Sequence, residues 1–173
     1  YLDTDERRRF ASNDHEYLIE QLQFQEYGKE TEHDLDFNHP VKEIIWVGKP
    51  PSQSGYNITN GPTTPVTLVG GEYNIEFNNE PRLKKRHLKY FTQSQIYDHH
   101  SGFGGINHPD SIAVYSFAIN PEFHQPSGTC NFSRLDTARL IHDKSETNGL
   151  YIYAINYNIL KISKGMANLL YAN

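Results

Sequence analysis

The chain has 173 residues, the size of one domain, with 16 basic and 21 acidic residues and a formal net charge of −5. This acidic balance argues against non-specific binding to DNA. A single cysteine, Cys130, excludes an internal disulfide, and no apolar run approaches the roughly 20 residues of a membrane-crossing helix. Because the chain opens with Tyr1 and its only methionine is Met166, we expect it to be part of a longer polypeptide.

A short helix is predicted from Asp3 to about Ser12. Asp3 or Thr4 can cap its N-terminus, and acidic residues precede three arginines, an order that complements the helix dipole. So short a helix depends on packing, for which Phe10 is the candidate side chain.

Strand patterns dominate the rest of the chain. Residues 15–25 favour a strand by their alternation, although Leu18 and Leu22 also have helical spacing. A run of β-branched and aromatic residues after Pro40 predicts a strand at 41–47. The other predicted strands are 73–77, 88–97, 111–119, 134–142, 150–162 and 166–171.

Two long segments read as loops. Residues 48–71 are rich in proline, glycine and polar residues, and they contain Asn57, a possible glycosylation site in an Asn-x-Thr triplet. A second triplet begins at Asn131. Residues 99–110 form the other loop. The basic cluster at 82–89 could touch nucleic acid or an acidic partner, but we favour a solvated loop and strand edge.

Eight short strands with turn signals and long crossovers predict an all-β antiparallel sandwich with one short helix and long loops. Composition alone does not separate a jelly roll from an immunoglobulin-like sandwich. We expect residues 1–173 to form one domain, with residues 1–14 as its junction and helix.

Metal or catalytic chemistry has weak support in the sequence. Four histidines invite comparison with the metal sites of cupins, which are also jelly rolls: His99, His100, His108 and His124. They lie in predicted loops beside glycine and proline, where turn-capping is the more common role. A Gly-x-Ser-x-Gly elbow and a phosphate-binding glycine loop are both missing. We therefore predict no enzyme, no cofactor and no metal.

The most distinctive segment is 120–134, a strand exit into a stiff polar turn. Pro121 and Pro126 restrict the backbone and Gly128 permits a sharp bend. Arg134 is expected to hold a carboxylate or several carbonyl groups.

This segment belongs to a longer one, YSFAINPEFHQPSGTCNFSRLD at 115–136, which resembles a motif of major capsid proteins of nucleocytoplasmic large DNA viruses, such as chlorella viruses, iridoviruses and mimiviruses. Further matches follow in the family's order at 2–10, 15–23, 37–46, 153–161 and 165–173. The resemblance covers nearly the whole chain except 48–86. The residues that carry it include Arg7, Arg8, Phe10, Phe37, Asn38, His39, Pro40, Trp46, His124, Gln125, Pro126, Gly128, Cys130, Asn131, Arg134, Asn156 and Asn158.

The resemblance implies that the chain is the C-terminal jelly roll of a double jelly-roll polypeptide. Three such polypeptides would form a pseudo-hexameric trimer that tiles an icosahedral virion shell, assembled in the host cytoplasm above an internal membrane. The implied partners are further copies, the N-terminal jelly roll, neighbouring capsomers, and penton and minor capsid proteins, with no specific nucleic acid. Two alternatives remain open: a carbohydrate-binding jelly roll and a cupin-like metalloprotein.

Overall fold

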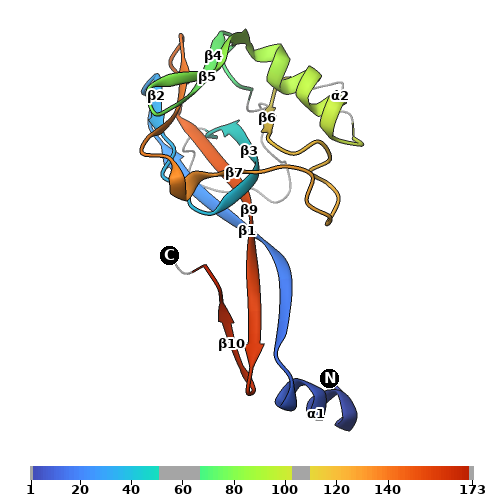
Figure 1. Cartoon of the computed structure of the whole chain (residues 1–173). Helices are drawn as coiled ribbons and strands as arrows, with labels where there is room; N and C mark the ends of the chain where they lie inside the picture. The colour runs from blue at the N-terminus through green and yellow to red at the C-terminus, as the bar shows by residue number, and fades with distance from the viewer. Residues whose placement is uncertain (1, 51–66, 103–109, 172–173) are drawn as a thin grey trace.

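The computed structural model describes residues 2–50, 67–102 and 110–171, which form two antiparallel β-sheets with short helical segments between strands (Figure 1). The strands are β1 (His15–Tyr27), β2 (Glu32–Asp34), β3 (Pro40–Gly48), β4 (Glu72–Phe77), β5 (Glu80–His87), β6 (Ile112–Ser116), β7 (Cys130–Asn131), β8 (Ala138–His142), β9 (Leu150–Ser163) and β10 (Met166–Leu169). The helical segments are α1 (Thr4–Ser12), the π-helical turn η1 (Tyr90–Ser94), α2 (Gln95–His99) and the 3₁₀ turn η2 (Phe132–Arg134). None of these described helices is long and apolar enough to cross a membrane.

The strand order is that of a jelly roll. One sheet runs β1-β9-β3-β6 and the other β2-β8-β4-β5. The pairs are therefore nested: β1 with β9, β2 with β8, β3 with β6, and β4 with β5. Eight principal strands folded in this way form a jelly roll. The short strands β7 and β10 add to β3 and β9. The predicted antiparallel jelly-roll sandwich is confirmed.

The core lies between the two sheets and follows the two-residue period of the strands. Ile44 and Trp46 of β3, Ile75 of β4, Leu140 of β8 and Ile152 of β9 are all fully buried. Residues between them face outward, as expected when successive side chains point to opposite faces. Trp46 is the single tryptophan, and its ring lies 5.1 Å from that of Phe91.

The predicted strand at 88–97 is wrong, because this segment is helical. Its buried side chains are Leu88, Phe91, Thr92 and Gln95, which recur with the three-to-four-residue period of a helix. This packs Phe91 against Trp46 over the core. The sequence contained that period, but its aromatic and β-branched content favoured a strand.

Three strands were missed: β2, β5 and β7. The first and last are only three and two residues long. β5 is strongly basic and almost wholly exposed at the edge of its sheet, so it lacks an apolar face to reveal it. Of the favoured interpretation of the basic cluster, a solvated loop and strand edge, the exposed strand edge is confirmed, whereas residues 82–87 are strand and not loop.

The two long strands continue beyond the sandwich as an arm (Figure 1). Residues 150–156 of β9 pair with both β1 and β3, whereas 157–163 pair only with β1 and β10. The helix α1 lies at the far end of the arm. Asp3 and Glu6 form a reciprocal capping box at its start. None of its side chains is fully buried, and Phe10 packs against His15 with ring centroids 4.5 Å apart.

Candidate functional site

Three of the segments that carry the family resemblance meet at one place, which we call the motif junction: residues 37–40, 130–133 and 156–158. Pro40 lies opposite Asn131 in the β3–β7 pairing. The amide of His39 donates to Ser133 Oγ over 2.9 Å, and the amide of Phe132 donates to the His39 carbonyl over 3.0 Å. His39 has φ of 68°, a left-handed conformation that reverses the chain at the start of β3. Phe37 contacts Phe132 edge to face at 6.1 Å.

Buried amide side chains tie the motif junction to β1. Gln23 Nε2 donates to Asn156 Oδ1 over 2.9 Å and to the Asn38 carbonyl over 2.7 Å, while Gln23 Oε1 accepts from the Asn38 amide over 2.9 Å. Asn158 Nδ2 donates to Gln21 Oε1 over 2.8 Å and to the Tyr171 carbonyl over 2.9 Å. Asn156 and Asn158 are 0% and 1% exposed, so these bonds offset a large desolvation cost.

Gln21 and Gln23 were missed at the sequence level. Their spacing of two residues indicates that both side chains lie on one face of β1. Their partners follow only from the register between β1 and β9, which the sequence does not give.

A buried lysine anchors the turn that follows β6. A β-bulge between Val41 and Glu43 turns the Lys42 side chain toward β1. Its ammonium lies 2.7 Å from the Glu20 carboxylate and donates to the Pro121 carbonyl over 2.7 Å, and its side chain is only 4% exposed. The Lys42 carbonyl accepts from the amides of Phe117 and Ala118. Both ends of this one residue therefore hold the turn.

The neighbouring Glu43 forms a second charged contact. Glu43 Oε2 lies 3.0 Å from His100 Nε2, an ion pair when the imidazole is protonated. His100 Nδ1 lies 3.3 Å from the Glu122 carboxylate. Burial raises the pKa of Glu43, while the nearby His100 and Lys42 oppose that shift. Hydrogen bonds from Ser101 hold the pKa of Glu122 below its usual value.

The histidines of the cupin comparison have separate surroundings. His99 Nδ1 bonds the Ile119 carbonyl at 2.9 Å, His100 lies between two carboxylates, and His124 is exposed. His108 lies outside the described residues, as does Asn57. Within the described ranges, no three His, Cys, Asp or Glu side chains gather in a way that could hold a metal ion.

The remaining residues of the turn are mostly at the surface. Gln125, Pro126 and Arg134 are exposed, and Arg134 makes no hydrogen bond or ion pair with the described part of the chain, contrary to expectation. Gly128 has φ of 151°, and a Cβ there would lie 2.5 Å from the Phe117 carbonyl oxygen, so glycine is required. Cys130 is half-buried, and burial raises the pKa of its thiol, which disfavours the reactive thiolate.

Arg7 and Arg8 lie on the exposed helix α1, far from the motif junction. Arg7 Nε donates to the Leu2 carbonyl, and Arg8 lies 3.7 Å from Asp5.

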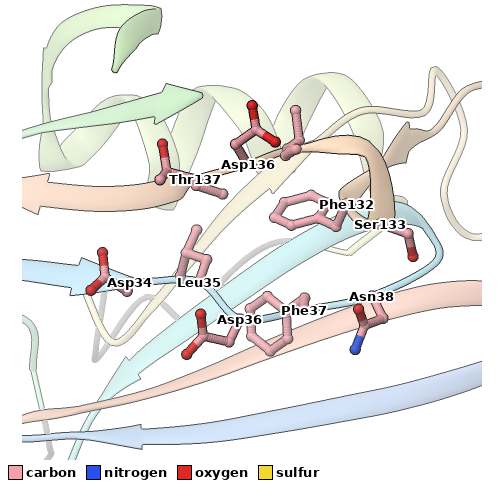
Figure 2. Close-up of a pocket in the computed structure, with 11 residues that line it drawn as sticks. Asp34, Leu35, Asp36, Phe37, Asn38, Phe132, Ser133, Asp136 and Thr137 are labelled. Atoms are coloured by element: carbon pink, nitrogen blue, oxygen red, sulfur yellow. The ribbon is translucent and has the colours of Figure 1, made fainter. Parts of the chain in front are cut away.

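Beside the motif junction lies a hollow of about 430 Å³ (Figure 2). It opens between the segment after β2 and the segment that joins η2 to β8. Apolar side chains, among them Leu35 and Phe132, line it together with three exposed carboxylates, Asp34, Asp36 and Asp136. None of its eleven lining residues is a histidine, cysteine, lysine or arginine. The three carboxylates give the hollow a negative field.

The comparisons with known proteins agree with this architecture. Residues 6–168 match the family model described as large eukaryotic DNA virus major capsid protein. The chain belongs to this family of capsid proteins. A major capsid protein of Pyramimonas orientalis virus is 41% identical over 100% of the chain and 47% of its own length. That of Paramecium bursaria Chlorella virus 1 is 36% identical over 100% of the chain and 52% of its own length.

Solved capsid proteins have the same fold. The crystal structure of PBCV-1 VP54, fitted into a reconstruction of the virophage Sputnik, matches with a TM-score of 0.81 at 32% identity. It covers 100% of the chain and 55% of the solved chain. The Faustovirus major capsid protein matches with a TM-score of 0.67 at 12% identity, which shows the shared fold alone. The chain spans about half the length of the curated capsid proteins that it matches.

Proposed function

We propose that the chain is the C-terminal jelly roll of a double jelly-roll major capsid protein, and that it acts as a structural unit of an icosahedral virion shell. The observation that carries this proposal is the match of the entire chain to about half of each capsid relative. In this proposal the polypeptide forms a trimer of pseudo-hexameric outline, which contacts neighbouring capsomers, penton proteins and minor capsid proteins and is assembled in the host cytoplasm.

An apolar surface on the outside of the β1-β9-β3-β6 sheet supports this role. We call it the outer apolar face; its residues are Leu22, Phe24, Ile45, Val47, Tyr151, Tyr153 and Ile155. The register places them together, with Phe24 opposite Tyr153 and Val47 opposite Tyr151. Leu22 and Phe24 are 63% and 50% exposed, and the other members are partly exposed. A contiguous patch of this kind marks an interaction site, and the N-terminal jelly roll is the partner that we propose.

A non-enzymatic role fits the polar groups of the described residues. The buried polar side chains of the motif junction bond to each other or to the backbone, and Lys42 faces the carboxylate of Glu20. Such groups position segments of the chain.

Light scattering coupled to size-exclusion chromatography on the full polypeptide tests the proposal. We expect the mass of a trimer, and electron microscopy of assembled material should show hexagonal capsomers. A stable monomer at high concentration would contradict the proposed function.

A further inference from the structure

The exposed strand β5 concentrates positive charge on an otherwise acidic chain. Six basic side chains occur in or directly after it: Arg82, Lys84, Lys85, Arg86, His87 and Lys89. All six are exposed, and none of them forms an ion pair within the described residues. Two of the six have a local partner: Arg86 lies 5.6 Å from the ring of Tyr90, and Arg82 acts on the hydroxyl of Tyr115.

The opposite edge of the same sheet is acidic. Glu30, Glu32, Asp34 and Asp36 alternate along and beside β2, and all four are exposed while the residues between them turn inward. Asp136 adds a fifth carboxylate at the hollow described above. Arg139 lies 3.7 Å from Glu32, and the other carboxylates have no ion-pair partner in the described chain.

The two charged edges cannot neutralise each other within one molecule. Strands β8 and β4 separate β2 from β5, which puts the edges three strand spacings, or about 14 Å, apart. The negative field at the β2 edge also acts on Tyr27, whose pKa is raised by burial and then by Asp36 and Asp34. Each edge is therefore left with charge that a complementary surface can neutralise.

We propose that the basic β5 edge of one copy docks against the acidic β2 edge and hollow of a second copy. This inference rests on the proposed function, in which copies assemble around symmetry axes. A contact between two different edges is heterologous, and repetition of such a contact produces a ring or lattice, as a shell requires. Most apolar residues of the hollow, such as Phe132, are almost fully buried, so its accessible lining is mainly polar and suits a lysine ammonium that meets Asp36 or Asp136.

Lysines on an edge strand also prevent uncontrolled pairing with other strands. That protective role requires no acidic counterpart, whereas the docking role predicts specific Lys–Asp proximity between copies. The two roles therefore differ in what a short-range crosslinking experiment detects.

The first test uses the unaltered full polypeptide, assembled from equal amounts of unlabelled and ¹⁵N-labelled copies. A carbodiimide joins lysine amines to carboxylates that are in direct contact. We expect mixed-isotope peptides that join Lys84 or Lys85 to Asp36 or Asp136. Crosslinks only within one copy, crosslinks from these lysines to other regions of the polypeptide, or no crosslink at these lysines would each overturn the proposal.

The second test reverses charge. K84E/K85E and D36K/D136K should each raise the concentration for half-assembly about tenfold, since complementary charges promote encounter and set register. An equal mixture of the two variants, or all four changes in one chain, should restore part of the assembly that each double variant loses. K144E/K164E is the matched control, because both lysines are exposed and have no ion-pair partner in the described chain. Thermal unfolding verifies that each variant is folded.

The outcomes separate this inference from the proposed function. If the unaltered polypeptide does not assemble, both are overturned. If it assembles and the reversed variants assemble equally well, the docking contact is overturned and the capsid role stands. If K84E/K85E loses retention on double-stranded DNA while assembly is unchanged, β5 is a nucleic-acid surface and the docking proposal is likewise overturned.

Discussion

At the scale of single residues, two buried histidines link the second sheet. His33 of β2 and His142 of β8 are 1% and 3% exposed, and their Nε2 atoms lie 2.8 Å apart. His142 Nδ1 contacts the Lys144 carbonyl and must carry a proton to donate to it. Its Nε2 therefore accepts from His33 Nε2–H, and His33 Nδ1 remains a buried acceptor without a partner. The pair fits two neutral rings, and a third proton, on His33 Nδ1, would find no hydrogen-bond acceptor there.

Acid should therefore destabilise the fold through His33. Burial, and then the neighbouring His142, lower the pKa of His33 from 6.5 to about 4. The unfolded chain takes up this proton first, so stability rises with pH between about 4 and 6.5 and is lost as pH falls through that window. We expect urea unfolding to show a loss of about 2 kcal/mol from His33 between about pH 7 and pH 5.

The variant His33→Gln should lose less unfolding free energy between about pH 7 and pH 5 than the unaltered protein, because glutamine does not titrate. His124→Gln is the control, since His124 is exposed. An unchanged pH dependence in His33→Gln would refute this assignment.

At the scale of elements, the turn between β6 and β7 is held by polar contacts as well as by the packing of Phe117 and Ala118. Its backbone bonds the Lys42 carbonyl at one end, its Pro121 carbonyl accepts from the Lys42 ammonium, and His99 bonds the Ile119 carbonyl. Two of these contacts lead to Lys42 of β3 and the third to His99 of α2. The conformation of this turn therefore depends on Lys42 as well as on residues within the turn, such as Gly128.

Lys42→Met should release the turn. The change leaves the Pro121 carbonyl without its donor and Glu20 without its partner, at a cost of about 2–4 kcal/mol. Amide hydrogen exchange should increase most at residues 117–128. Lys161→Met is the matched control: its ion pair with Glu16 is exposed and contributes at most about 1 kcal/mol. Exchange in the turn that stays as slow as in the unaltered protein would contradict this account.

At the scale of the whole molecule, the jelly roll leaves a large part of its apolar surface uncovered. The outer apolar face and the arm both expose large side chains, including Leu22, Phe24 and Tyr171. The nested pairing already satisfies the inner faces of both sheets. The uncovered surface is therefore available to a partner domain or a partner copy.

The double variant L22D/F24D tests whether that face is covered in the assembled protein. In the isolated chain Leu22 is 63% and Phe24 50% exposed, so the change should cost mainly the ring contacts of Phe24 with Tyr151 and Tyr153. In the full polypeptide each substitution removes about 1.5–3 kcal/mol of stabilisation from the burial of an apolar side chain. This loss should lower the melting temperature and the trimer yield. Tyr97→Asp, at a side chain 75% exposed on α2, is the control. Equal melting temperatures for L22D/F24D and the unaltered polypeptide would count against the covered face.

Much of the fold could be predicted from sequence because it is local in origin. The alternation on β9 and the apolar run of β3 each depend on neighbouring residues, and both strands were predicted nearly to their ends. The helical segment at 88–99 was predicted as a strand because its composition favours β structure. The helical period of Leu88, Phe91 and Gln95 was overlooked.

The sandwich class, most of the strands, the glycine of the turn at 120–134 and the capsid family could all be inferred from the residues alone. The pairing of polar groups could not, because it joins distant parts of the chain: Gln23 bonds Asn156 across 133 residues of sequence, and His33 bonds His142 across 109. The physical reason is that a side-chain period is set by backbone geometry, residue by residue. The partner of a buried polar group is set by the register between strands, which forms only when distant parts of the chain pack together.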